Sequence, residues 1–251
     1  MTITQNSTQN RPEPMIPVVD EIADDIYRIS TWIPDVSPEG FTFNQFLVLG
    51  DEPLLFHTGT RALFPVVAEA VATVMPIETL RWITFGHVEG DECGAMNLWL
   101  DAAPDAEVAH NALGVDISLN DLCDRPPRIL DEGEVLDIGG KRLRQISTPH
   151  VPHGWEAHVL FEETTKTLLC GDLFSHIGAP PAITTGDVVG AAIAADEMFG
   201  AMSLSPQTDA TLRMLGDLEP TTLAIMHGAA FQGDGRQAFT DLADALTASA
   251  G

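Results

Sequence analysis

Metal-chelating side chains follow predicted strands at four separate places in the chain, and this pattern constrains the protein more than any other feature of its sequence. The side chains are His87, Glu89, Asp91, His153, Asp172 and His227. The first three alternate in one short polar segment, and eighteen residues separate His153 from Asp172. Loops after strands are where rigid scaffolds present functional groups. A single histidine after a strand is usually structural, but this joint arrangement predicts a metal site.

Strands and helices alternate at both ends of the chain, and a run of strands fills its middle. Apolar, aromatic and β-branched residues predict strands at 41–49, 53–57, 80–85, 106–109, 134–138, 142–146, 159–162, 167–169 and 222–226. Helical spacing of apolar residues predicts helices at 63–74, around 98–100, at 187–202, at 206–218 and around 239–246. The alternation indicates an α/β fold with mixed sheets.

The charge balance excludes several classes of partner. The chain has 12 basic and 37 acidic residues, and its net charge of −25 repels nucleic-acid backbones and anionic lipid surfaces. No apolar run approaches the ~20 residues that a membrane helix needs. We therefore expect no nucleic acid and no membrane as a partner.

The domain organisation is expected to be simple. The polar residues 1–16 predict a flexible tail, and residues 17–251 predict one folded domain. The N-terminus lacks the basic and then apolar pattern of a secretory signal. Three cysteines, Cys93, Cys123 and Cys170, are too few and too odd in number for a disulfide framework. These features predict a cytoplasmic protein.

The ordered chelating residues resemble those of the metallo-β-lactamase superfamily. Most hydrolases of this superfamily carry HxHxDH, whereas this chain has Glu89 where their second histidine stands. That substitution, and the spacing from His153 to Asp172, resemble the metal-binding domain of flavodiiron proteins and their single-domain oxygen-binding relatives. The resemblance covers approximately Phe41 to His227. It implies an αββα sandwich, in which two mixed sheets lie between layers of helices.

The resemblance also implies a division of the ligands between two metal ions. His87, Glu89 and His153 would bind one ion, Asp91 and His227 would bind the other, and Asp172 would bridge them. Imidazole and carboxylate form a harder ligand set than thiolate, so iron is expected, with zinc or manganese as the other candidates. A bridging carboxylate can hold two cations about 3.5–4 Å apart.

Two residues depart from the family pattern. Glu92 stands where the family usually has a histidine, so the second metal would have one ligand fewer or a harder one. His57 replaces the aspartate that generally stands in the first motif of the superfamily. We interpret His57 as a hydrogen-bonded core histidine or as a partner of a metal ligand.

Three further residues allow more than one interpretation. His150 is a rival of His153, because it lies close by in the same loop. His176 follows Asp172 by four residues and either lines the pocket or is an ordinary loop histidine. Cys93 adjoins the motif and is interpreted as a small buried apolar residue.

Three functions remain as hypotheses. The first is a non-haem diiron protein that binds or reduces dioxygen or nitric oxide, with Trp155 and Phe174 keeping its pocket dry. The second is a binuclear zinc hydrolase of an ester, lactone or thioester, in which a metal-bound hydroxide attacks. The third is an oxygen sensor without turnover. The sequence shows no GxGxxG and no flavin-binding domain, so electrons are expected from a separate donor protein. The resemblance suggests a homodimer.

Overall fold

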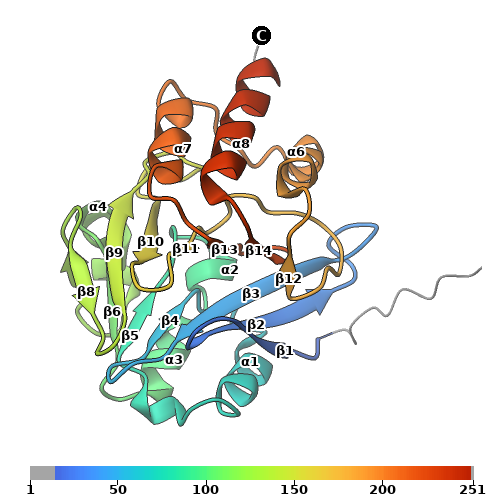
Figure 1. Cartoon of the computed structure of the whole chain (residues 1–251). Helices are drawn as coiled ribbons and strands as arrows, with labels where there is room; N and C mark the ends of the chain where they lie inside the picture. Colours follow the sequence, from blue (N-terminus) through green and yellow to red (C-terminus); the bar gives the residue numbers. More distant parts are fainter. Residues whose placement is uncertain (1–14, 250–251) are drawn as a thin grey trace, which may run out of the picture.

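Two mixed β-sheets pack face to face in the computed structural model, which describes residues 15–249 (Figure 1). The first sheet has the strand order β1 (Val18–Ala23), β2 (Ile26–Ile33), β3 (Phe41–Val48), β4 (Leu54–Phe56), β5 (Trp82–Thr84), β6 (Glu107–Asn111) and β7 (Arg128–Leu130). The second has the order β12 (Ile183–Thr184), β14 (Ala230–Gln232), β13 (Thr222–Ala224), β11 (Thr167–Leu169), β10 (His158–Glu162), β9 (Arg142–Ser147) and β8 (Val135–Asp137).

The helices cover the outer faces of both sheets. They are α1 (Phe64–Val71), α2 (Gly90–Cys93), α3 (Met96–Ala102), α4 (Ala112–Gly114), α5 (Asn120–Leu122), α6 (Val188–Phe199), α7 (Thr208–Gly216) and α8 (Gly235–Ser249). In Figure 1, α1 and α3 lie below the first sheet, and α6, α7 and α8 lie above the second. The predicted αββα sandwich with two mixed sheets is therefore confirmed.

Period-two alternation along the strands explains the layers. In β3, Phe46 faces the space between the two sheets, whereas Leu47 faces α1 and α3. In β4, Phe56 and Leu55 divide in the same way. Successive side chains of a strand point to opposite faces, so a sheet covered on both sides has apolar residues at nearly every position. For this reason the strands of the first sheet have nearly continuous runs of apolar residues in their sequence.

Both sheets combine parallel and antiparallel pairs. In the first, β4, β5 and β6 run parallel, and in the second β11 and β13 run parallel. Parallel neighbours have their carboxyl ends on the same side, so the loops that follow them are brought together. The chelating residues after β5, β11 and β13 lie in these loops.

The hairpin of β1 and β2 was not predicted from the sequence. These strands pair antiparallel through a two-residue turn, Asp24-Asp25, in which Asp25 has a φ of 58°. Such a turn requires positive φ, which Asn-Gly or Asp-Gly signals more strongly than two aspartates do. Residues 15 and 16 of the expected tail are described and lie before β1, whereas residues 1–14 lie outside the described part of the chain.

Several predicted elements are shorter in the structure. The helix expected at 187–202 is α6, which Asp187 caps by accepting a hydrogen bond from the Gly190 amide at 2.9 Å. It ends at Phe199 because Gly200 takes a left-handed conformation with φ 63°. The helices expected at 63–74 and 206–218 likewise end early, at Val71 and Gly216. Within residues 15–249, no helix is long and apolar enough to cross a membrane.

Candidate metal centre

The six predicted ligands are carried by loops and by the short helix α2 at one end of the two sheets. His87 follows β5, Glu89 stands at the start of α2, and Asp91 lies within that helix. Asp172 follows β11, and His227 follows β13. His153 comes from the loop between β9 and β10. Each sheet thus contributes part of the site, and only their packing brings the parts together.

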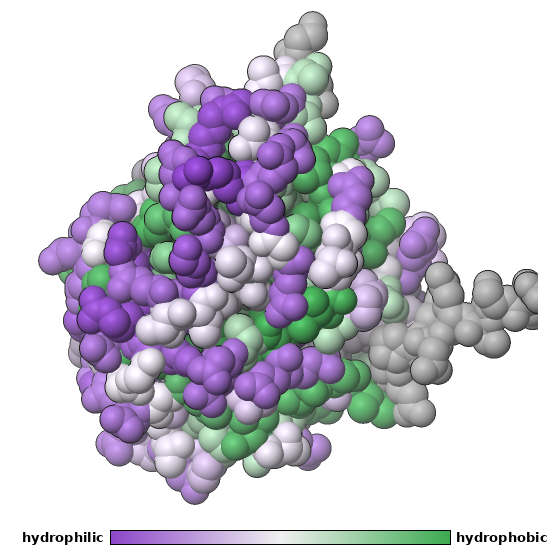
Figure 2. Space-filling model, viewed as in Figure 1, coloured by the Kyte–Doolittle hydropathy of each residue, from purple (hydrophilic) through white to green (hydrophobic). Residues whose placement is uncertain are grey.

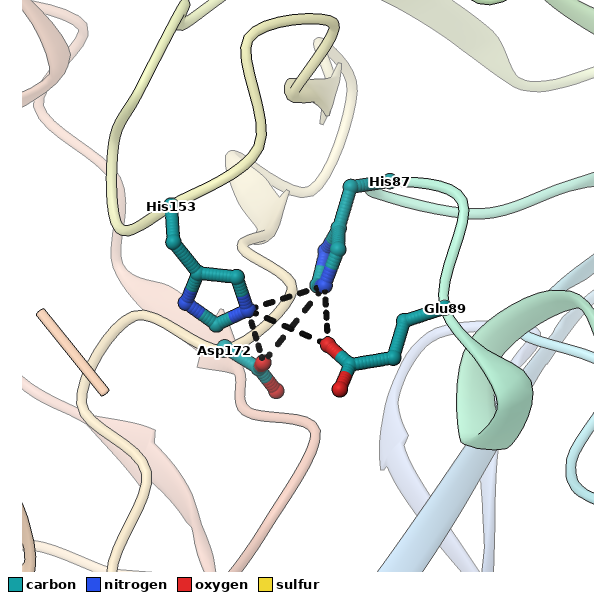
Figure 3. A group of neighbouring side chains, drawn as sticks. All are labelled: His87, Glu89, His153 and Asp172. Atoms are coloured by element: carbon teal, nitrogen blue, oxygen red, sulfur yellow. Dashed lines mark hydrogen bonds and ion pairs between the residues drawn. The ribbon is translucent and has the colours of Figure 1, made fainter. Parts of the chain in front are cut away.

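Four of these side chains converge on one point (Figure 3). One ligand atom from each of His87, Glu89, His153 and Asp172 lies within 4.8 Å of the others. His87 Nε2 is 2.7 Å from Glu89 Oε2 and 2.9 Å from His153 Nε2. Two imidazole nitrogens and two carboxylate groups that face one another form a donor set for a divalent cation.

A second group of donors lies on the other side of Asp172. His227 Nε2 is 3.3 Å from Asp91 Oδ2 and 3.2 Å from Asp172 Oδ1. The other oxygen of Asp172, Oδ2, is 3.4 Å from His153 Nε2 and 4.0 Å from His87 Nε2. Asp172 therefore presents one oxygen to each group of donors.

The outer nitrogen of each of these histidines faces an acceptor. His153 Nδ1 donates to the Ala201 carbonyl at 2.9 Å, and His227 Nδ1 donates to the Thr42 carbonyl at 2.8 Å. His87 Nδ1 lies 3.2 Å from Glu92 Oε1. A proton held at Nδ1 leaves the Nε2 lone pair free for a metal. The Nε2 atoms of His87 and His153 face the first group of donors and that of His227 faces the second, so the donor set fits a pair of metal ions.

The electrostatics of the centre favour positive charge. Burial of His87 disfavours its charged form, but Glu92 and Glu89 outweigh burial and raise its pKa to about 12. Burial opposes the charge on His227 as well, yet Asp172 and Asp91 raise its pKa to about 10. Carboxylates stabilise a positive charge whether a proton or a metal ion carries it.

The acidic partners show the complementary effect. Hydrogen bonds with His153 and then His87 lower the pKa of Glu89. Burial alone would raise the pKa of Asp172, but His227 and the other histidines lower it to about 2. These carboxyl groups are therefore ionised over the whole neutral pH range, which is the state that binds cations.

Glu92 and His57 lie behind His87 and away from the second group of donors. Glu92 is fully buried, and its Oε2 accepts a hydrogen bond from the His87 amide at 2.8 Å. Its Oε1 lies 3.4 Å from His57 Nε2, and His57 Nδ1 faces the Asn44 carbonyl at 3.3 Å. Glu92 therefore adds no harder ligand to the second group of donors, and the alternative expectation of one ligand fewer stays a prediction. The two residues form a buried acid–imidazole pair that supports His87.

The structure also gives the positions of His150, His176 and Cys93. His150 is exposed, and His153 is the member of this loop that belongs to the cluster. His176 is buried, donates to the Phe174 carbonyl at 3.0 Å and accepts from the Ala229 amide at 2.9 Å. The side chain of His176 therefore holds the loop that follows His227 by binding the backbone amide of Ala229. Cys93 is buried in the apolar core, as expected.

The expectation for the pocket walls is correct for one residue and wrong for the other. Phe174 lines the cavity over the donors, whereas Trp155 is 54% exposed and lies at a different depression of the surface. The aromatic neighbour that sequence reasoning missed is Phe41, whose ring stacks on His227 with centroids 4.3 Å apart. Its position at the start of an apolar strand gave no separate signal.

Residues from β3 hold the backbone around His227, and sequence reasoning missed them too. Thr42 Oγ1 accepts from the Gly228 amide at 2.7 Å, and Asn44 Nδ2 donates to the Gly228 carbonyl at 2.9 Å. Polar residues within a strand that is otherwise apolar were the available signal. Gly228 has a φ of 121°, and a Cβ there would lie 2.3 Å from the ring of His176. Only glycine fits this position.

Comparison with known proteins places this geometry in a family context. The model of the family described as "ODP family beta lactamase" matches residues 41–228. The solved structure of a metal-soaked Flv1 flavodiiron core from Synechocystis superposes with a TM-score of 0.78 at 19% identity, over 92% of this chain and 61% of that one. This likeness concerns the fold.

Two curated relatives carry different activities in their names. The rubredoxin-oxygen oxidoreductase of Megalodesulfovibrio gigas is 23% identical over 206 residues, which are 79% of this chain and 51% of that protein. A hydroxyacylglutathione hydrolase of Acidiphilium cryptum is 30% identical over 153 residues, 57% of each chain. The aligned segments therefore cover about half the length of each of these two curated relatives.

Proposed function

Because the chain belongs to the ODP family of beta-lactamase-like proteins, we propose that its six converging side chains hold two metal ions, preferably iron. The centre would bind and reduce dioxygen or nitric oxide with electrons from a separate donor protein. His87, Glu89 and His153 would hold one ion, and Asp91 and His227 would hold the other. Asp172 would bridge the two.

The position of Asp172 carries this proposal. Its Oδ1 lies 3.2 Å from His227 Nε2, and its Oδ2 lies 3.4 Å from His153 Nε2. A carboxylate with one oxygen toward each of two histidine groups has the geometry of a bridge. A site for a single metal ion would use only one of these oxygens, and the donors on the other side of Asp172 would then bind no metal.

The donor chemistry supports iron over zinc. Three carboxylates and three imidazoles form an oxygen-rich set, whereas zinc sites are rich in thiolate and imidazole. Two divalent ions carry four positive charges, and three carboxylates leave about one, so an anionic oxygen ligand is still attracted. Bound iron would pass on the electrons of the separate donor and would offer open coordination positions for the gas. Around it, the chain's own residues orient the donors, and the rings of Phe41 and Phe174 exclude water from the cavity.

The names of two relatives support the choice of reaction. A rubredoxin-oxygen oxidoreductase is similar over most of this chain, and a flavodiiron core has the same fold. We propose the corresponding use of oxygen for this chain, with the electron donor as a separate partner. Free thiols at Cys93, Cys123 and Cys170 fit a reducing cytoplasm, and a homodimer is part of the same proposal.

Reconstitution tests the proposed metal and reaction together. The metal-free protein, loaded anaerobically with two equivalents of ferrous iron, should consume or bind dioxygen or nitric oxide. The measurement is an oxygen or nitric oxide electrode trace together with the absorption spectrum before and after the gas is added. The zinc form is the control and should show neither change. An inert iron form beside a zinc form that hydrolyses esters or lactones would overturn the proposal.

A binuclear zinc hydrolase is the second candidate, and the similarity to a hydroxyacylglutathione hydrolase favours it. Two zinc ions in the same donor set would activate a water for attack on an ester, lactone or thioester. Glu89 argues against this candidate, because a carboxylate there replaces the imidazole of the hydrolase motif. An oxygen sensor without turnover would bind the gas and consume none, which the electrode trace separates from reduction.

The buried pair behind His87 gives a separate prediction. Glu92→Ala should lower the affinity of the centre for its metals by roughly 10–100-fold, the usual effect of losing a group that orients a ligating histidine. Glu92→Gln should retain part of the affinity, because an amide oxygen can still accept from His87. Competition with a metal chelator measures both, and Glu197→Ala, an exposed change on α6, is the control. Unchanged affinity in Glu92→Ala would show that Glu92 does not orient His87.

A further inference from the structure

The metal donors form the floor of a cavity that is much larger than a diatomic gas requires. Its volume is about 390 Å³, and Glu89, Asp91, His153, Asp172 and His227 are among its lining residues. One water molecule takes up about 30 Å³ of liquid, so the space is roughly ten times that of a small gas molecule. Pockets of about 300–1,000 Å³ are typical of sites for small organic molecules.

The walls of this cavity are apolar and come from α6, α8 and the start of β3. Ala192 and Ile193 of α6 and Leu242 and Leu246 of α8 are among its lining residues, and the two pairs belong to one apolar cluster. Figure 2 shows hydrophobic residues gathered beside α6 on the face that it shares with Figure 1. A wall of this kind would bind an apolar body by removing it from water.

An aromatic surface leads from the mouth of the cavity to the donors. Phe199, at the end of α6, is 43% exposed, and its ring centroid lies 5.3 Å from that of Phe41. Phe41 in turn stacks on the imidazole of His227. A ligand could therefore contact apolar surface along its whole length while its head reaches the centre.

The floor of the cavity, in contrast to its apolar walls, is suited to a negatively charged head group. With two divalent ions bound, the three carboxylates Glu89, Asp91 and Asp172 leave about one net positive charge. Asp196, the remaining acidic group among the described lining residues, already accepts a hydrogen bond from the Met202 amide at 2.8 Å through Oδ1. A carboxylate head is complementary to this floor, and an apolar tail is complementary to the walls.

We propose that the centre binds a small organic acid, with its carboxylate at the metals and its apolar body between α6 and α8. This inference rests on the proposed two-metal function, and it adds a ligand class to the same site. The acid would occupy the cavity beside the position of the gas. Its apolar part would be recognised by contact area and not by hydrogen bonds.

A chain-length series tests the proposal. Protein loaded with two zinc ions is titrated with acetate, butanoate, hexanoate and octanoate by isothermal titration calorimetry. Affinity should rise by about fourfold for each added methylene from butanoate onward, because each buried methylene contributes a fixed free energy. The metal-free protein should bind octanoate at least tenfold more weakly, since the head group then meets only carboxylates.

Two variants on one helix complete the test. Ala192→Trp fills the cavity and should abolish the gain with chain length, while metal content and acetate binding stay unchanged. Ala194→Trp, two residues away on the exposed side of α6, should bind octanoate as the parent protein does. A flat series in protein that holds two metals, or octanoate binding unaffected by Ala192→Trp, would overturn the inference. Protein that holds fewer than two metals would instead count against the proposed function, so the two failures are distinguishable by metal analysis.

Discussion

Asp172→Ala should remove both metal ions from the protein at once. Each oxygen of Asp172 faces a different pair of donors, with Oδ1 toward His227 and Oδ2 toward His153. Without this carboxylate each ion loses a ligand, and the three carboxylates that offset four positive charges become two. Repulsion between the two cations then rises where their shared ligand is missing. The metal content measured by elemental analysis after dialysis should fall from about two equivalents per chain to nearly none.

The control for this experiment is an acidic residue outside the site. Asp101→Ala changes an exposed side chain of α3 and should keep the full metal content. Circular dichroism should show the same secondary structure for both variants, because the sheets are held by three apolar clusters that Asp172 does not belong to. Two retained equivalents in Asp172→Ala would contradict the bridging role, and loss of only one would indicate a ligand of one ion.

The metal content of the protein should respond very differently to alanine at His153 and to alanine at His150. His153→Ala should lose the metal held with His87 and Glu89, an effect larger than the roughly 10–100-fold expected for a supporting group. His153 Nε2 lies 3.2 Å from Glu89 Oε2, and its Nδ1 is fixed by the Ala201 carbonyl. His150→Ala should keep the metal content, because His150 is exposed and outside the cluster.

Metal titration of the metal-free variants measures this difference. The parent protein should take up two equivalents with tight binding, and His150→Ala should match it. His153→Ala should show tight binding of one equivalent at most. The reverse ranking would place His150 at the metal and would mean that the loop after β9 has a different register.

Much of the fold and the location of the candidate site followed from the sequence alone. Period-two and apolar patterns located β3, β4, β10 and β11 within about one residue, because burial of these strands demands such residues on their faces. The chelating residues stood out because carboxylates and imidazoles directly after buried strands are rarely needed for packing. Order and spacing then gave the family resemblance, which the family match confirms.

Short-range signals failed where the structure depends on distant partners. The β1–β2 hairpin turns at Asp24-Asp25, a weaker hairpin signal than Asn-Gly or Asp-Gly, and the hairpin is held by the pairing of β2 with β3. The predicted C-terminal end of α6 was three residues too late, because the left-handed Gly200 ends this helix at Phe199. Both ends of α7 were misplaced by two residues, and no capping side chain marks its start.

Tertiary structure alone decided what surrounds the six donors. The sequence placed Glu92 next to Asp91 and left open whether the second metal has one ligand fewer or a harder one. The turn into α2 directs Glu92 inward to His87 and His57, which is 35 positions away in the chain. Thr42 and Asn44 reach the loop of His227 across about 185 residues of sequence. The cavity between α6 and α8 exists because both helices pack on the second sheet and leave a gap over the donors. Side-chain direction and empty space are set by how layers pack against each other, and residue types along a chain do not encode that packing locally.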